Sequence, residues 1–212
     1  MKRSKVTTAP ASEPVTLTEL KASLRITTTA EDTLLTQYIE DARIMVERMT
    51  GRKLITQTIT EYHDGLCGRQ EEFESGYQMR SIGSLVQGGQ FAPLDFAPVQ
   101  SITTVHTVDL GNAETLYDSA NYYLSNYDDD MKPTVELNSG STITTALRAD
   151  NNIKIVYVAG YGDDGADVPS ALRRAILVLA GMLYANRGDC GDQCQTDCGA
   201  KAMIYPYIIK TI

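Results

Sequence analysis

The sequence predicts an α+β fold, in which a small helical bundle carries an inserted antiparallel β-sheet or small barrel. Apolar residues recur with a helical period near both ends of the chain and with a period of 2 in its middle. The bundle is expected to hold two N-terminal helices and one long C-terminal helix. The expected segments are a flexible arm (1–14), a helical domain in two parts (15–53 and 168–187), an inserted β domain (54–167) and an extended C-terminal tail (188–212).

The first helix follows an N-terminal arm. Residues 1–14 hold small residues and two prolines without periodicity, which is typical of a flexible arm. Thr16 and Glu19 have the spacing of a capping box, in which each side chain bonds the backbone N–H of the other residue. Apolar residues then recur at helical spacing (Leu17, Leu20, Leu24).

A long amphipathic helix is predicted from about Glu31 to Gly51, a residue suited to a left-handed C-cap. Apolar residues share one arc of its helical wheel (Leu34, Leu35, Tyr38, Ile39, Ala42, Met45, Val46, Met49). Polar residues, Arg43 and Glu47 among them, fill the opposite side. Ile44 lies in this polar arc, so it is either a scattered surface apolar residue or a contact with another subunit.

From Leu54 the period changes to 2, because Ile55, Gln57 and Ile59 alternate with threonines. This alternation predicts a strand with one buried face. Residues 63–90 are rich in Gly, Glu and Gln and show no period, so they are expected to form a loop or a long hairpin.

The rest of the middle region predicts further strands. The segment SITTVHTVDL is expected to place Ile102, Thr104, His106 and Val108 on one face. Short strands separated by turn clusters are predicted beyond it (115–117, 122–125, 134–137, 152–159). Their spacing suits an antiparallel sheet or small barrel inserted between helices.

The last helix is predicted to begin near Pro169 and to run to about Arg187. Its residues 175–185 are apolar or small in every direction, so this helix needs cover on all sides, from its own subunit or from another. The closing segment AMIYPYIIKTI is also apolar and has little local structure to bury it, so it is expected to dock on another surface rather than extend into water.

The charge of the chain disfavours a nucleic-acid-binding regulator. Acidic residues outnumber basic ones by 27 to 19, which gives a net charge of −8, whereas binding to a phosphate backbone needs clustered Lys and Arg. No signal peptide is recognised, and the longest apolar run has about half the length of a bilayer span. We therefore expect a soluble protein made in the cytoplasm, without a membrane partner.

The sequence offers little for catalysis. It lacks the nucleophile-elbow, phosphate-loop and zincin motifs, and no cofactor is expected. The exception is a cysteine cluster, Cys190, Cys194 and Cys198, with Cys67 far upstream. These thiols are either free, joined in a disulfide, or weak candidates for a metal site. A small metal-binding or redox enzyme centred on them is the alternative function, and it predicts loss of function in Cys194→Ser.

Several segments, in this order, resemble the head–tail connector (adaptor) family of tailed phages and gene transfer agents. They are VTLTELKASLRI, MTGRKLITQT, APVQSITTV, IKIVYVAGYG, VPSALRRAILVLAGMLYANRG and the closing YPY. The chain departs from the family pattern in the loop at 66–90 and in the cysteine-bearing segment 188–199. It also carries Ile208 and Ile209 where relatives often have a basic residue.

The resemblance implies a non-enzymatic structural protein of the virion neck, made in the host cytoplasm. Such proteins form a homo-oligomeric ring, usually a dodecamer, below the portal protein and above a tail, stopper or nozzle protein. DNA passes through the ring without specific binding. The resemblance implies portal contact by Tyr205, Pro206 and Tyr207, and we expect a ring interface at Arg43, Ile44 and Glu47.

Overall fold

The computed structural model describes residues 3–68, 90–125, 131–143, 146–186 and 199–209. The described elements are, in chain order, β1 (Arg3–Thr8), α1 (Leu17–Leu24), α2 (Asp32–Thr50), β2 (Gln57–His63), β3 (Cys67–Gly68), β4 (Gln90–Pro93), β5 (Val99–Val108), β6 (Glu114–Tyr117), the 3-10 helix η1 (Ser119–Asn121), β7 (Tyr122–Ser125), β8 (Thr134–Leu137), β9 (Ile153–Ala159), η2 (Gly165–Asp167), α3 (Ser170–Ala185), α5 (Ala200–Ile204) and η3 (Tyr205–Tyr207).

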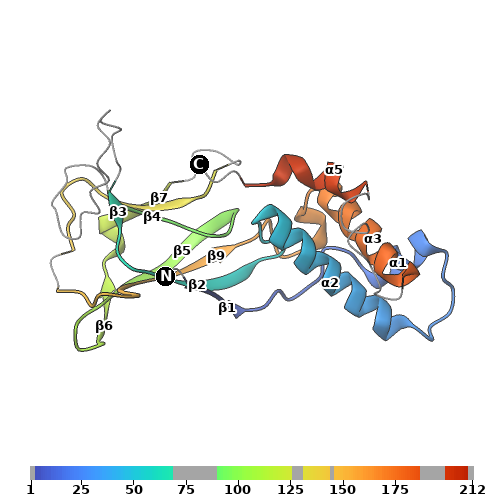
Figure 1. Ribbon diagram of the computed structural model, residues 1–212, viewed down its shortest axis with the longest axis horizontal. Helices are drawn as coiled ribbons and strands as arrows, with labels where there is room; N and C mark the ends of the chain where they lie inside the picture. Colours follow the sequence, from blue (N-terminus) through green and yellow to red (C-terminus); the bar gives the residue numbers. More distant parts are fainter. Residues whose placement is uncertain (1–2, 69–89, 126–130, 144–145, 187–198, 210–212) are drawn as a thin grey trace.

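The helices gather at one end of an elongated molecule and the strands at the other (Figure 1). The strands form two antiparallel sheets, one with the order β1-β2-β9-β5-β6 and the other with the order β3-β4-β8-β7. The predicted α+β class is therefore confirmed. Both N-terminal helices and the long C-terminal helix lie close to their predicted positions.

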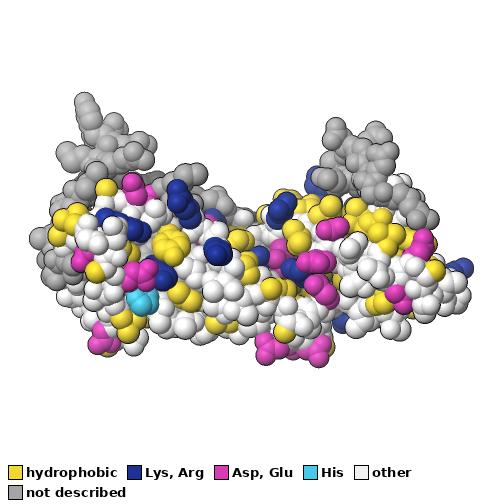
Figure 2. All heavy atoms as spheres, turned by 90° about the horizontal axis from the view of Figure 1, so that it is seen from below, with side chains coloured by type: hydrophobic (Ala, Val, Ile, Leu, Met, Phe, Trp, Pro, Cys, Tyr) yellow, Lys and Arg dark blue, Asp and Glu magenta, His cyan; other side chains and the backbone are white. Residues whose placement is uncertain are grey.

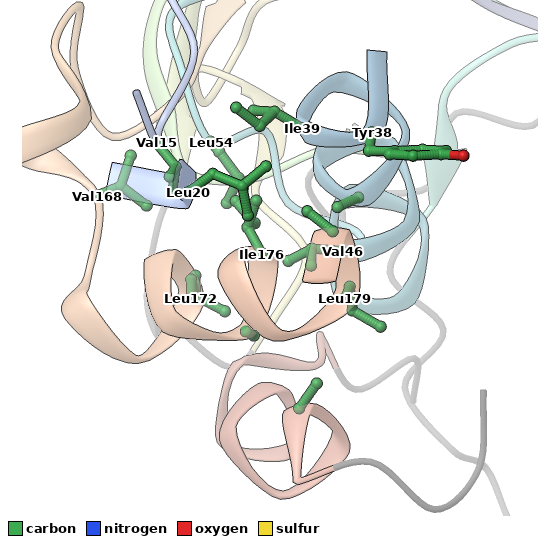
Figure 3. Packing of buried hydrophobic residues seen from close by; sticks show 14 of the residues in the cluster. Val15, Leu20, Tyr38, Ile39, Val46, Leu54, Val168, Leu172, Ile176 and Leu179 are labelled. Atoms are coloured by element: carbon green, nitrogen blue, oxygen red, sulfur yellow. The ribbon is translucent and has the colours of Figure 1, made fainter. Parts of the chain in front are cut away.

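The helical end is built around apolar side chains that point toward one another from α1, α2 and α3 (Figure 3). Leu20 of α1, Val46 of α2 and Ile176 of α3 are completely buried in this cluster. The capping box at the start of α1 is present, because the backbone N–H of Thr16 bonds Glu19 and that of Glu19 bonds Thr16. Gly51 ends α2 with a φ of 71°, the left-handed conformation expected of it.

Helix α3 is only partly covered by its own subunit. One side is buried against α1, α2 and α5 (Leu172, Ala175, Ile176, Leu179, Ala180). The side that holds Leu177, Val178 and Met182 is half-buried. No described helix is long and apolar enough to span a bilayer.

The β end has a second apolar core, and its side chains come from both sheets. Ile59 on β2 and Ile155 and Tyr157 on β9 contribute from the first sheet, and Ala92 and Val135 from the second. Because β2 and β9 each contribute alternate residues to this core, the period of 2 in the sequence reports their buried face.

The expectation of a flexible arm is wrong for residues 3–8, which form β1. This strand pairs antiparallel with β2, and Val6 lies opposite Ile59. All six of its residues are exposed. A strand without buried side chains leaves no apolar period in the sequence, so the sequence held no signal for it.

The single alternation expected in β5 is also wrong. The pairing of β5 with β9 shifts register between Val99 and Ser101 and again between Ile102 and Thr104. Beyond the second shift Val105 and Thr107 are buried, whereas Thr104 and His106 are half-buried. An extra residue at a bulge moves the following side chains to the opposite face, so one alternation cannot continue through β5.

The C-terminal tail was expected to be extended, but its described part is helical. Residues 200–204 form α5, and residues 205–207 continue it as the 3-10 helix η3. Ala200 and Ile204 are buried in the helical core. The apolar segment therefore docks on its own subunit. Five residues are too few for a stable helix on their own, so packing on the helical core stabilises α5.

Candidate functional site

The C-terminal segment (residues 199–209) carries an exposed aromatic residue, Tyr205, on backbone that is bonded to the rest of the subunit. The side chain of Tyr205 is 73% exposed, and Pro206 beside it is exposed as well. Tyr207 is half-buried and packs against the helical core. A tyrosine held outward in this way suits contact with a partner protein, because its ring offers apolar area and its hydroxyl a hydrogen bond.

Two hydrogen bonds join the residues after Tyr205 to the end of α2 and the residues that follow it. The guanidinium Nε of Arg52 donates to the carbonyl of Tyr207 over 2.7 Å. The backbone N–H of Ile209 donates to the carbonyl of Thr50 over 3.0 Å. Residues more than 150 positions apart in the sequence thus meet at one place. Ile204 and Ile209 are buried there, so detaching the C-terminal segment from α2 would expose both side chains.

On α2, the structure buries two residues that were expected to face solvent. Arg43 is 6% exposed and Glu47 is 4% exposed. The guanidinium Nε of Arg43 donates to Glu13 over 2.8 Å, and another of its nitrogens lies 3.6 Å from Glu47. Burial raises the pKa of Glu13, against the opposing effect of its hydrogen bond with Arg43.

Glu47 joins the helical end to the β end. Its carboxylate accepts hydrogen bonds from Lys53 Nζ at 2.9 Å, from the backbone N–H of Leu54 at 3.2 Å and from Gln57 Nε2 at 3.0 Å. Lys53 in turn lies over the ring of Phe96, 4.6 Å from its centroid. A buried carboxylate needs such partners, because its desolvation is offset only by charges and hydrogen bonds.

The residues named for a ring interface therefore differ in their surroundings. Arg43 and Glu47 lie inside the subunit, and Ile44 between them in sequence is half-buried. The helical wheel assigned both charged residues to solvent because it describes only the helix itself. The N-terminal segment and the start of β2 cover that side of α2, and no period in the sequence reports such cover.

The β end buries a second polar cluster, which the sequence did not indicate. Glu61 is completely buried, and it accepts hydrogen bonds from the hydroxyl of Tyr157 at 2.9 Å and from the backbone N–H of Asp95 at 3.1 Å. His63 Nε2 lies 3.1 Å from Glu61 Oε1. Burial and the neighbouring Glu61 raise the pKa of Tyr157 far above its ordinary value. Because these groups lie in the interior of the β end, we assign them to holding the fold together.

A surface groove of about 400 Å³ lies away from this cluster, between α1 and the start of α3. It is lined by polar and apolar side chains (Val15, Ser23, Ser170, Arg173, Arg174, Leu177, Val178). In it Arg173 is already engaged, because its guanidinium bonds Glu19 at 2.6 Å and the carbonyl of Pro14 at 3.1 Å. The groove brings no acid–base pair to a common point.

The metal-site candidates Cys190, Cys194 and Cys198 lie outside the described residues. Within the described part of the chain, no group of three His, Cys, Asp or Glu side chains is placed to hold a metal ion. The surface seen in Figure 2 carries Lys and Arg side chains interleaved with Asp and Glu, so no single charge dominates that face.

Residues 14–82 match the family model of the phage gp6-like head-tail connector proteins. This stretch includes the capping box of α1, all of α2 and all of β2. The resemblance to head–tail connectors that the sequence indicated is thereby confirmed. No protein of curated function matches the chain.

Solved structures with the same fold include chains of gene transfer agent (GTA) particles. A chain of the structure described as "Neck of empty GTA particle computed with C6 symmetry" has a TM-score of 0.76 at 21% identity, over 99% of this chain and 97% of that chain. A chain of "Virion of native gene transfer agent (GTA) particle" has a TM-score of 0.72 at 22% identity, with coverages of 99% and 96%. A chain of "Neck of native GTA particle computed with C12 symmetry" has a TM-score of 0.68 at 21% identity, with coverages of 99% and 97%.

At this identity the solved structures establish a common fold. The matched family model and the shared fold point to a structural, non-enzymatic protein.

Proposed function

We propose that this chain is a head–tail connector that lies in the neck of a phage-like particle and joins the head to the tail. The proposal rests on the agreement of two findings. The connector-family match at residues 14–82 occurs in a chain whose fold, over 99% of its length, is that of a chain in a GTA neck. Identity of function does not follow from fold alone, but an independent family match on the same chain favours it.

In this proposal, copies of the chain form a closed ring of twelve subunits, the number usual in the connector family. The C6 and C12 symmetries of the matched neck structures support a ring. Head-to-tail contacts that close by rotation join two different surfaces of each subunit. The half-buried side of α3 and the half-buried Ile44 are apolar surfaces that such contacts would cover. Arg43 and Glu47 would support this interface from inside the subunit, because they bond α2 to Glu13 and Lys53.

The C-terminal segment is the proposed contact with the portal protein above the ring. Tyr205 and Pro206 would make the contact, and Tyr207 would hold them through its packing and its carbonyl. One small apolar contact is weak, but many copies on a symmetric partner bind together, so that the ring gains strength without new contacts.

A tail, stopper or nozzle protein would bind below the ring, and DNA would pass through the channel. The net charge of −8 supports a channel wall that does not bind DNA tightly, because like charges repel.

The test is to image purified particles by electron microscopy, with the chain traced in the neck density. The expected result is a ring of this chain between portal and tail. Absence of the chain from purified particles would overturn the proposal.

The portal contact is tested with Tyr205→Ala combined with Pro206→Ala. DNA-filled heads that stay unjoined to tails are expected, since the variant removes exposed groups from an intact base. The matched control is Tyr123→Ala, which removes an exposed tyrosine at the β end and should leave joining unchanged. Normal infectious particles from the double variant would contradict the portal contact.

A further inference from the structure

The five-stranded sheet has two open edges of different chemistry. Its order is β1-β2-β9-β5-β6, so among the described strands β1 and β6 each pair on one side only. All of β1 is exposed, as are three of the four residues of β6. An exposed strand edge presents unpaired backbone N–H and C=O groups, which bind another strand readily.

Direct pairing across the sheet shows which side chains share a face. Arg3 on β1 lies opposite Tyr62, Tyr62 opposite Lys154, Lys154 opposite His106, and His106 opposite Leu116 on β6. Directly paired residues point to the same side of a sheet. Arg3 and Lys5 on one edge therefore lie on the same face as Glu114 and Leu116 on the other edge, and period 2 puts Ser4 on the opposite face.

The direction of the strands decides how two sheets can join. Every neighbouring pair in this sheet is antiparallel, and four such pairings lead from β1 to β6. Because four is an even number, β1 and β6 run in the same direction. A rotation about an axis along the strands keeps that direction. Copies related by such a rotation can therefore place β1 of one beside β6 of the next as a parallel pair.

Charge favours this arrangement over a two-fold one. Edge β1 carries Arg3 and Lys5, whereas edge β6 carries Glu114 and an exposed Leu116. Two β1 edges would bring like charges together, and two β6 edges would do the same with Glu114, which destabilises cross-strand pairs. Glu114 already bonds Lys154 over 2.7 Å within its own subunit, and a second cation from a neighbour would lie on the same face.

We propose that β1 of one copy pairs in parallel with β6 of the next, so that the five-stranded sheets continue around the ring. This inference rests on the proposed ring, and it assigns the ring a second contact apart from α2 and α3. It also accounts for β1 itself, which buries none of its side chains in a single subunit.

The first test is cross-linking in the full chain with its four native cysteines replaced by serine. A chain with both Lys5→Cys and Leu116→Cys should give, under mild oxidation, a ladder of covalent oligomers up to the full ring. Chains with only one of the two changes should stay monomeric on a denaturing gel. The matched control joins Ser4→Cys with Leu116→Cys, which puts the thiols on opposite faces and should lower the cross-linking rate at least about tenfold.

The second test is charge reversal in the chain with native cysteines. Arg3→Glu with Lys5→Glu should raise the concentration needed for half-assembly roughly tenfold, and so should Glu114→Lys alone. Combining all three changes should restore assembly, because the charges are complementary again. Circular dichroism of each variant checks that the subunit is folded.

The outcomes distinguish failure of this inference from failure of the proposed function. Absence of rings from the unaltered chain, both alone and with its portal protein, overturns the proposed function and this inference together. Two results would overturn this inference alone: rings that give no ladder of cross-linked oligomers, or a half-assembly concentration that the charge reversals leave unchanged. Covalent dimers from Lys5→Cys by itself would indicate two-fold β1 pairing and would also overturn it.

Discussion

The helical end and the β end each bury a glutamate, and the two differ in how far along the chain their partners lie. Glu47 is bonded by groups 6, 7 and 10 residues away, Lys53 among them. Glu61 is bonded by Tyr157, 96 residues away, and by the backbone N–H of Asp95, 34 residues away. One carboxylate is thus held by its neighbours in the sequence and the other by the topology of the sheets.

This difference matters for how the two ends are specified. The bonds to Glu47 can form once α2 and β2 meet, which needs only a short loop to close. The bonds to Glu61 require β9 to pair with β2 and the Asp95 segment to pack on them. Contacts between distant residues carry a larger loop-closure cost, so they depend on the assembled fold rather than on local sequence.

The largest expected effect is at the junction. Glu47→Ala leaves Lys53 and Arg43 buried without their shared carboxylate, which should lower the free energy of unfolding by about 3–5 kcal/mol. Urea unfolding followed by circular dichroism measures it. The control is Glu40→Ala, which removes an exposed carboxylate 3.8 Å from Arg43 and should cost at most about 0.5 kcal/mol. Equal costs for the two variants would contradict the role of Glu47.

The helical end also depends on one distant segment. Ile204 is completely buried, so Ile204→Ala should lower the free energy of unfolding by about 2–5 kcal/mol. Tyr205→Ala, its exposed neighbour, should stay within about 0.5 kcal/mol of the unaltered chain. Thermal unfolding of both variants checks the contrast. A stable Ile204→Ala chain would mean that the C-terminal segment does not support the helical core.

A smaller effect is expected at the β end. Tyr157→Phe removes the hydroxyl that bonds Glu61 and keeps the ring, which should cost about 1–3 kcal/mol. Tyr123→Phe is the matched control, because its hydroxyl also bonds a buried carboxylate, Glu136, at 2.6 Å, but Tyr123 itself is 42% exposed whereas Tyr157 is completely buried. It should cost less than about 1 kcal/mol by urea unfolding. If Tyr123→Phe lowered the free energy of unfolding more than Tyr157→Phe does, burial would not explain the cost of losing the hydroxyl.

The smallest effect concerns acid stability. Hydrogen bonding from the Thr16 backbone, with Arg173 nearby, lowers the pKa of Glu19 below 4.5. A carboxylate with a lowered folded-state pKa contributes stability above pH 4.5, and this is lost as pH falls through the folded-state pKa. Glu19→Gln should therefore be less stable than the unaltered chain near pH 6, and the gap should close in acid.

Glu13 should change the stability with pH in the opposite direction to Glu19, because burial raises its pKa. Its folded state binds more protons than its unfolded state above pH 4.5, so its contribution to stability falls as pH rises. The difference in unfolding free energy between the unaltered chain and Glu13→Gln should change with pH in the reverse sense to that for Glu19→Gln. Urea unfolding at a series of pH values measures both differences, and parallel trends would contradict the assignment.

Elements whose burial follows their own period were predictable. Strand β9 alternates buried and half-buried residues and begins within about a residue of its expected position, and α3 begins beside Pro169 as expected. The short strands β6, β7 and β8 also begin within about a residue of their expected positions, because turn clusters in the sequence separate them. The bulges in β5 and the strand β1 were not predictable, because a bulge interrupts the period and an exposed edge strand has none.

The candidate contact residues divide in the same way. The apolar character of the closing segment was visible in the sequence, but its docking onto Thr50 and Arg52 was not, since those residues lie more than 150 positions upstream. Likewise, a helical wheel cannot show that Glu13 and Lys53 cover Arg43 and Glu47.

The sequence by itself determined the positions of α1, α2, α3, β2 and β9, because local periods and caps reflect each element's own geometry. It also determined the acidic charge and the surplus of apolar side chains in α3 and the C-terminal segment. Only the tertiary structure decided which carboxylates are buried, that Tyr205 points outward, and that β1 and β6 lie at opposite edges of one sheet. Those features depend on which distant segments meet, and pairing between distant segments leaves no local pattern in the chain.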